Sequence, residues 1–210
     1  MHGAQLFEHL AAYPADARLF EGAMAAGTSF LGLVPGLPDL PATGTVVDVG
    51  GSDGRLLDLV LTAAPGLRGV LFDRPHVTAA AAEVPAAHGE RAEVVAGDFF
   101  HDPVPAGGDL YLLSRIMHDW DDERCSAILR NVRAAMAEGA TPAVVERPIR
   151  DDPGTLLPLA FDVHMMVNTV QGGERTTDEH RRLPAADGFA LEDVRELPLD
   201  VAVLIARAVV

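Results

Sequence analysis

A chain of 210 residues is long enough for one domain with a full hydrophobic core and too short for two domains of ordinary size. Acidic residues outnumber basic ones by 31 to 16, and the resulting net charge of −15 disfavours nucleic acid as a partner while it favours a cationic ligand. The sequence has no apolar run of the roughly 20 residues that a membrane span requires, no visible signal peptide and a lone Cys125, which together predict a cytoplasmic protein without a membrane partner.

Residues 1–44 are expected to form a helical segment and a linker that pack on the main domain. Apolar residues spaced by three and four between positions 4 and 31 predict two short helices, the second of which begins near Pro14. A loop rich in proline and glycine then runs from Pro35 to Gly44. We interpret this loop as a connection, because too little chain precedes it to form a separate core.

Residues 45–210 are predicted to form an α/β domain. Five apolar strands are expected, at 45–50, 68–73, 92–97, 109–116 and 142–147. The segments between them are long enough for right-handed crossovers, which predicts parallel pairing. Two further strands, 190–197 and 201–209, are separated by a connection short enough for an antiparallel pair. The expected sheet is therefore mostly parallel and ends in an antiparallel hairpin.

The clearest helix is predicted at 121–137, where apolar residues share one face and three acids occupy the first turn. Cys125 lies on that apolar face and is expected to be a buried structural thiol. An apolar helix is predicted at 155–170, and a short one near 177–187 that Pro184 should distort or end.

A glycine-rich turn follows the first predicted strand, in the segment from Asp48 to Gly54. Ligands of open α/β sheets bind outside the carboxyl ends of the strands, so a nucleotide-like cofactor is expected there. Counting from Gly50, the third position is Ser52, whereas the dinucleotide fingerprint requires glycine. An NAD-dependent dehydrogenase is therefore the least favoured enzyme class.

Acidic residues also end the next two strands. Asp73 could accept hydrogen bonds from both hydroxyls of a ribose, or could instead cap the segment that begins at Pro75. Asp98 occupies the corresponding place after the third strand. Acids scattered over strand ends, without clustered His or Cys, predict no metal site.

Six segments, in this order and spacing, resemble the S-adenosylmethionine-dependent O-methyltransferases of the caffeic acid and hydroxyindole type: VVDVGGSDGRLL, LFDRPHV, GDFF, LLSRIMHDWDDERC, VVERPI and GGERT. The resemblance implies a Rossmann-like methyltransferase fold with seven strands and helices on both faces. It also implies methyl transfer from S-adenosylmethionine to a hydroxyl of a small aromatic or polyketide-like acceptor. Ser52 departs from the family, in which many members have a third glycine.

Such enzymes usually carry an N-terminal half that forms the dimer. This chain is expected to lack that half and to be the catalytic domain only, so that a homodimer would lack its usual dimerisation domain. Apolar surface along helices 4–12 and 155–170 is then expected to be exposed or self-associating.

The resemblance assigns roles to individual residues. Those implied to bind the cofactor are Asp48, Gly50, Gly51, Gly54, Asp73, Asp98, Phe99, Ser114 and Trp120, with Asp73 at the ribose and Asp98, Phe99 and Trp120 around the adenine. His118 would be the general base, held in place by Glu146 and Glu174. The implied acceptor pocket contains Met24, Asp119, Met165 and Thr169.

The chemistry agrees with a histidine at this position. A free phenol titrates near pH ~10, so attack at neutral pH requires a base, and histidine has an unperturbed pKa of ~6.5. The alternative is that His118 only caps the following helix and Glu146 pairs with Arg147 or another cation. His164 is equally compatible with a place in the pocket and with packing against a helix.

Two other functions remain open from the sequence. One is a cofactor-binding remnant that acts through protein contacts, and the other is a related cofactor-dependent enzyme with a non-methylating outcome.

Overall fold

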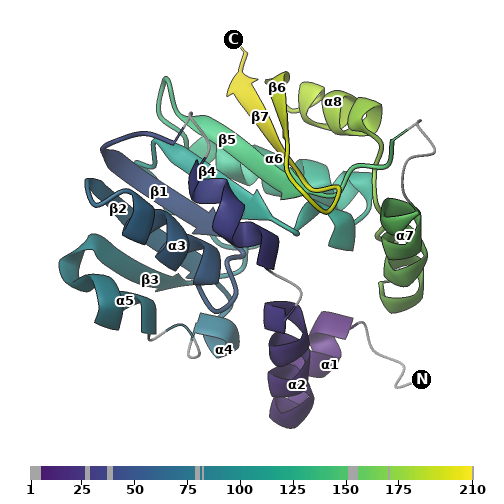
Figure 1. The fold of residues 1–210 in the computed structure, drawn as a ribbon, viewed down its shortest axis with the longest axis horizontal. Coiled ribbons are helices and arrows are strands. Elements are labelled where there is room, and N and C mark those ends of the chain that lie inside the picture. Colours follow the sequence, from purple (N-terminus) through teal and green to yellow (C-terminus); the bar gives the residue numbers. More distant parts are fainter. Residues whose placement is uncertain are drawn as a thin grey trace.

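The computed structural model describes residues 6–26, 29–36, 40–78, 81, 83–150, 156–169 and 171–209. Within these residues seven strands form one sheet in the order β3-β2-β1-β4-β5-β7-β6 (Figure 1). The strands are β1 (Gly44–Val49), β2 (Leu67–Asp73), β3 (Ala92–Ala96), β4 (Leu110–Ser114), β5 (Thr141–Glu146), β6 (Phe189–Glu196) and β7 (Ala202–Ala208).

The strand pairing confirms the predicted fold class. Neighbours among β1 to β5 pair in parallel, whereas β7 is antiparallel to both β5 and β6. Most strand ends lie within one residue of the prediction. The carboxyl end of β4 is the exception, because the strand was expected to continue to residue 116 and stops at Ser114. Arg115 has a φ of 57°, a left-handed conformation that cannot continue an extended strand.

Alternate strand residues pack into two cores on opposite faces of the sheet, as a period of two requires. One core contains Val46 and Leu112 together with α3 (Arg55–Ala63) and α5 (Glu83–His88). The other contains Leu113 together with α6 (Asp122–Ala135). Helices therefore cover both faces, and the central strands are buried between them (Figure 1).

The linker before β1 contributes to the first core. The sequence predicted helices and then a loop here, and the structure places a short 3-10 helix, η1 (Ser29–Gly36), between them. Leu31 and Val34 of η1 are buried in the same core as α3.

Helix α6 is one residue shorter at its start and two at its end than the predicted 121–137. Asp121 is its N-cap, and its carboxylate accepts a hydrogen bond of 2.8 Å from the Arg124 amide. Met136 has extended backbone and ends the helix. Cys125 is buried on the apolar face, as predicted, and burial raises the pKa of its thiol to about 12.

Helix α8 (Thr177–Ala185) begins at a capping box formed by Thr176 and Glu179. It ends one residue after Pro184. Pro184 thus lies inside the last turn of α8, where little helix remains for it to kink.

Besides α5, two short helical segments lie in the connection between β2 and β3. They are α4 (Pro75–Thr78) and the 3-10 helix η2 (Gly89–Arg91).

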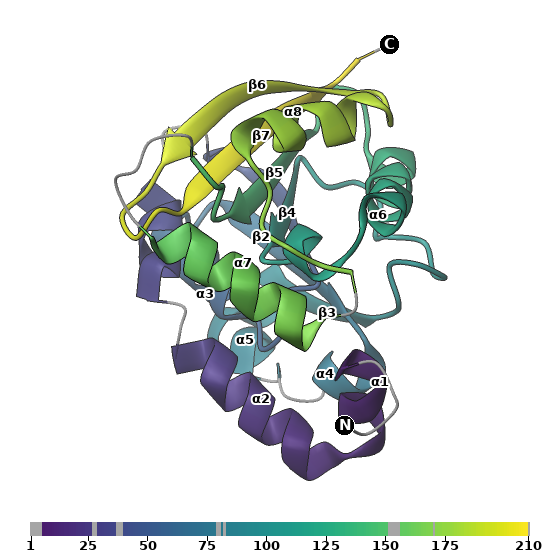
Figure 2. The ribbon, with the colours of Figure 1, turned by 90° about the vertical axis from the view of Figure 1, so that its right-hand side faces the viewer.

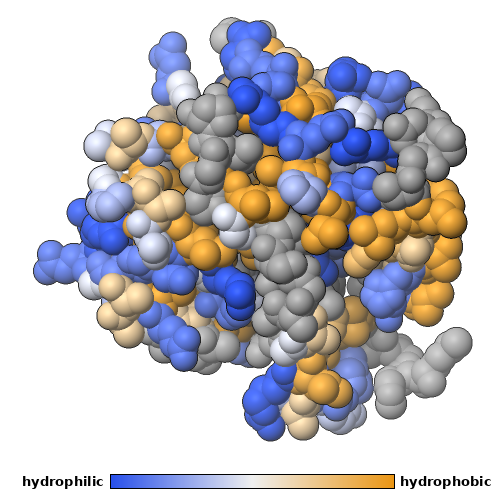
Figure 3. All heavy atoms as spheres, in the orientation of Figure 1, coloured by the Kyte–Doolittle hydropathy of each residue, from blue (hydrophilic) through white to orange (hydrophobic). Residues whose placement is uncertain are grey.

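Three helices lie beyond the carboxyl ends of the central strands (Figures 1 and 2). These are α1 (Leu6–Ala12), α2 (Pro14–Ala26) and α7 (Leu157–Asn168), and the break at Tyr13 confirms the two predicted N-terminal helices. Apolar side chains are exposed along α7 and at its start, as expected for this surface (Figure 3): Leu156, Leu159, Val163, Met166 and Val167. No helix in the described part of the chain, α7 included, has the length and hydropathy to cross a membrane.

We expect Asp121→Ala to lower the free energy of unfolding by about 0.5–2 kcal/mol, because it removes the acceptor for the Arg124 amide. Asp121→Asn retains a capping oxygen and should stay close to the wild type. Chemical denaturation of both variants checks this, and equal losses in the two would contradict a capping role.

Candidate functional site

A cavity of about 780 Å³ lies at the carboxyl ends of β1, β2 and β4. Its walls include the turn after β1, the 3-10 helix η3 (Met117–Asp119), and residues of α1, α2 and α7. The volume lies within the ~300–1,000 Å³ of typical small-molecule sites. Its place agrees with the rule that open α/β sheets bind ligands outside the carboxyl ends of the strands.

The turn after β1 depends on left-handed backbone at alternate positions. Gly50, Ser52 and Gly54 have φ values of 73°, 56° and 79°. Ser52 carries a side chain in a conformation that costs roughly 1–2 kcal/mol in L-residues. Its amide donates a hydrogen bond of 2.9 Å to Asp73 Oδ2, which holds the turn against β2. A Cβ at Gly51 would overlap Asp48 and Leu71, so only glycine fits there.

Asp48 lies directly behind this turn. Its side chain is fully buried, and neither carboxylate oxygen has a hydrogen-bond partner in the described structure. Burial, together with the nearby charge of Asp73, raises the pKa of Asp48 to about 7. A cationic group in the cavity would favour the ionised carboxylate.

Asp73 and Asp98 lie further along the same edge of the sheet. The Asp73 carboxylate accepts the amides of both Ser52 and Arg74, so it supports the turn as well as lining the cavity. Burial raises its pKa. Asp98 lines the cavity and accepts a hydrogen bond of 2.8 Å from the Phe100 amide.

Aromatic rings form the cavity wall beside Asp98. The ring centroids of Phe99 and Phe100 lie 6.3 and 4.8 Å from that of Trp120, both edge-on. The Arg124 guanidinium lies over the indole, 5.7 Å from its centroid.

The structure gathers most of the predicted cofactor residues around this cavity. Gly54 is the exception. It precedes the first residue of α3 and is buried against Val84 of α5. Those that line the cavity are Asp48, Gly50, Gly51, Asp73, Asp98, Phe99, Ser114 and Trp120.

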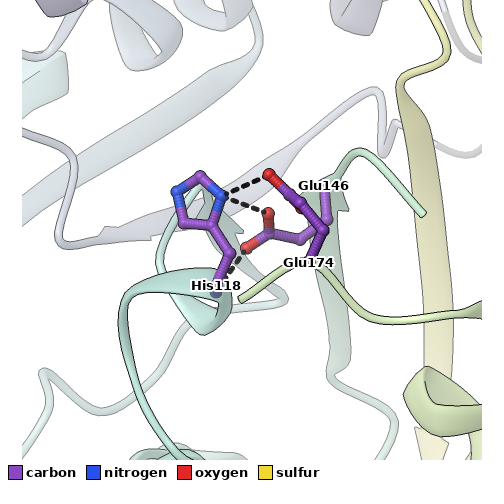
Figure 4. Close-up of side chains that lie close together, drawn as sticks. All are labelled: His118, Glu146 and Glu174. Carbon is purple, nitrogen blue, oxygen red and sulfur yellow. Dashed lines mark hydrogen bonds and ion pairs between the residues drawn. The ribbon is translucent and has the colours of Figure 1, made fainter. Parts of the chain in front are cut away.

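His118 lies in η3, where the chain leaves β4, and only 6% of it is exposed. Its Nδ1 is 3.0 Å from Glu174 Oε1 and 3.5 Å from Glu146 Oε2 (Figure 4). Nε2 lies on the other side of the ring, 3.9 Å from Asp119 Oδ1. Glu146 Oε1 also accepts the amides of Met117 at 2.9 Å and His118 at 3.4 Å. Glu146 thus faces the histidine and not Arg147.

The carboxylates around His118 decide its charge. Burial by itself lowers the pKa of the imidazole, but Glu146, Glu174 and Asp119 more than offset this and raise it to about 9. Burial also raises the pKa values of Glu146 and Asp119. The carboxylates therefore favour the positively charged form of the imidazole over the neutral form.

The prediction of no metal site stays a prediction at the cluster around His118. One ligand atom each of His118, Glu146 and Glu174 lies within 4.8 Å of the others, so the group could hold a metal ion. The 3.0 Å distance between Nδ1 and Glu174 is that of a direct hydrogen bond.

The predicted acceptor residues lie at the α7 side of the cavity. Met165 and Thr169 line it together with Asp119, whereas the Met24 side chain lies outside the described residues. The Thr169 hydroxyl donates to the Met165 carbonyl and accepts from the Gly172 amide, both at 2.9 Å, so it also closes the end of α7.

Sequence reasoning missed several residues of the cavity wall. Arg74 and Arg115 line it, and each directly follows a residue predicted for the site, so their place after a strand end was the available signal. Phe161 lies about one turn before Met165 on α7, and Asn168 lies about one turn after it, so all three share the side of α7 that faces the cavity. Of the two places that the sequence left open for His164, the structure shows the one in the cavity wall.

Comparison with known proteins gives a consistent result. Residues 1–190 match the family described as O-methyltransferase domain. The chain is 43% identical over 208 residues to a 3-amino-4-hydroxybenzoate 4-O-methyltransferase of Streptomyces cremeus, covering 98% of this chain and 57% of that protein. The chain thus spans about three fifths of the length of such relatives.

Solved structures are similar over nearly the whole chain. The crystal structure of LaPhzM has a TM-score of 0.93 and 39% identity, and the match covers 99% of this chain and 63% of that one. NcsB1, an O-methyltransferase from neocarzinostatin biosynthesis, was solved with S-adenosylmethionine and 2-hydroxy-5-methyl naphthoic acid. Its TM-score is 0.87 with 32% identity, and the match covers 99% of this chain and 62% of that one.

We expect Asp48→Asn to stabilise the ligand-free protein at pH 8, because folding then buries no charge. The folded pKa of about 7 exceeds the ordinary 3.8, so the stability from protonated Asp48 is complete below pH 3.8 and is lost as pH rises through 7. Denaturant titrations should show a gain on the order of 1–4 kcal/mol at pH 8 that shrinks as pH falls.

The exposed Glu93→Gln is the matched control, in which one carboxylate is lost from the surface of β3. A gain for Asp48→Asn that is the same at every pH would contradict the buried-charge explanation.

Proposed function

The chain belongs to the O-methyltransferase domain family, and from that premise we propose that it transfers the methyl group of S-adenosylmethionine to a hydroxyl of a small aromatic acceptor. The observation that carries the proposal is the state of His118: one ring nitrogen is held by Glu174, and the residue lines the large cavity. Two relatives support the acceptor class, because one is named for a hydroxylated benzoate and the other was solved with a hydroxylated naphthoic acid.

The residues around the glycine turn fit this cofactor. S-adenosylmethionine carries cationic groups, and the unpartnered buried carboxylate of Asp48 is suited to face one. Asp73 would hold the ribose, and Asp98, Phe99 and Trp120 the adenine, because acid and aromatic groups meet at that end of the cavity. When bound, the cofactor supplies an electrophilic methyl group.

His118 accepts the hydroxyl proton of the acceptor at Nε2. In the neutral imidazole, the hydrogen bond from Nδ1–H to Glu174 selects the tautomer that leaves the Nε2 lone pair free. The same carboxylate, with Glu146 at 3.5 Å, stabilises the imidazolium formed by proton transfer. The O–H proton thus moves to Nε2, and the electron pair of the O–H bond stays on the acceptor oxygen.

Asp119 orients the acceptor. Its Oδ1 lies 3.9 Å from His118 Nε2, so two atoms that can accept hydrogen bonds lie next to each other at the cavity wall. Two hydrogen-bond donors on neighbouring positions of one aromatic ring could reach both Asp119 Oδ1 and His118 Nε2. An acceptor with an amino or hydroxyl group next to the reacting hydroxyl therefore suits the site.

The direct test is transfer of labelled methyl from S-adenosylmethionine to a panel of phenols. We expect His118→Ala to lower kcat about 10²–10⁴-fold, the usual contribution of a general base, while calorimetry still detects cofactor binding. Arg181→Met, on the exposed face of α8, is the control and should leave kcat unchanged. Cofactor binding by the wild type without turnover of any acceptor would instead favour the remnant hypothesis.

The pH dependence of kcat/KM for the acceptor tests the base. Because only the neutral imidazole accepts a proton and its pKa is raised to about 9, the rate should rise with pH toward that value. Glu174→Gln removes a charge that raises this pKa, so the rising limb should move to lower pH. A limb that stays in place in Glu174→Gln would contradict the assignment.

A further inference from the structure

Arg175 is a buried cation beside the proposed base, and only 9% of it is exposed. We propose that Arg175 is a positioning residue that fixes the backbone turn carrying His118, so that the imidazole keeps its place between Glu174 and the cavity. The inference rests on the proposed function of His118 and adds a residue that acts through it.

The guanidinium binds backbone on both sides of His118. Its Nη1 donates to the Met117 carbonyl at 2.6 Å, and its Nη2 donates to the Trp120 carbonyl at 2.7 Å. Nε and Nη2 also reach Asp122 Oδ1, at 3.0 and 2.9 Å. One side chain thus ties both ends of η3 to the start of α6.

Arg175 and Glu146 bind the backbone of the same turn. The first amides of a helical turn lack partners within it, and Glu146 accepts those of Met117 and His118. Arg175 donates to the Met117 carbonyl, which also accepts the Trp120 amide at 3.4 Å, and to the carbonyl of the C-cap residue Trp120. Two buried charges of opposite sign therefore determine where η3 lies.

The segment that contains Arg175 also holds the imidazole. Gly173 N donates to the His118 carbonyl at 2.9 Å, and Glu174 accepts from the ring at 3.0 Å. The Arg175 carbonyl in turn accepts the Ile149 amide at 2.9 Å, which anchors the segment beyond β5. Because ring and backbone of His118 are bound by successive residues, a shift at Arg175 changes the distance between His118 and Glu174.

Lysine is not equivalent to arginine here. The planar fork of arginine reaches two carbonyls and a carboxylate at once, whereas lysine keeps the charge without the fork. Arg175→Lys therefore removes the planar fork and keeps the positive charge, whereas Arg175→Met removes both. The Cys125 thiol also donates to the Met117 carbonyl, at 3.2 Å, so that carbonyl keeps a partner in either variant.

Kinetics of the two variants test the proposal, with Arg181→Met as the exposed control. Misplacement of a reacting group by about 1 Å can cost roughly 10²-fold, so we expect kcat to fall about 10-fold in Arg175→Lys and up to about 100-fold in Arg175→Met. Cofactor affinity by calorimetry should stay near the wild-type value. A drop in kcat matched by an equal loss of cofactor affinity would overturn the proposal.

A second readout does not depend on activity. NMR titration of the His118 ring in the ligand-free protein should show a lower pKa in Arg175→Lys, because the ring loses its place against Glu174 while the charge at position 175 remains. An unchanged titration and unchanged kcat in Arg175→Lys would overturn the proposal, whatever the result for Arg175→Met. If the wild type transfers no methyl group, the proposed function fails, whereas the titration still decides the role of Arg175.

Discussion

The arrangement of the site depends on the buried carboxylate of Glu146. This group ends β5 with only 2% of the residue exposed, and a carboxylate so placed is costly unless donors and a cation face it. The η3 amides and the His118 ring supply both. Because β4 and β5 pair with Ser114 opposite Val145, the chain leaving β4 passes directly over Glu146. The register of β4 against β5 therefore also determines where His118 lies relative to Glu146.

The cavity concentrates negative charge where burial disfavours it. Asp48, Asp73 and Asp119 all have raised pKa values because they are withdrawn from water. Such groups lower the stability of the ligand-free fold, and a cationic ligand recovers that free energy on binding. The strained Ser52 in the adjoining turn is a second local cost at the same place. The buried carboxylates thus account both for the lower stability of the ligand-free protein and for the proposed recognition of a sulfonium cofactor.

Local patterns were sufficient for most of the fold. Apolar runs of strand length placed every strand, and the acids before Cys125 located the start of α6 to within one residue. The prediction failed at the end of β4 because residue type does not reveal that Arg115 is left-handed. The motifs around Asp48, Asp73 and His118 identified one edge of the sheet as the site, since the carboxyl ends of parallel strands meet there.

By itself the sequence determined the α/β class, the glycine turn and several of the residues that line the cavity. Only the tertiary structure decided how they meet. Glu146 and Glu174 converge on one nitrogen of His118 from 28 and 56 residues away, and Arg175 reaches the same turn. The physical reason is that these contacts are non-local: strand order and register bring the segments together, and burial then forces each charge to find its partner.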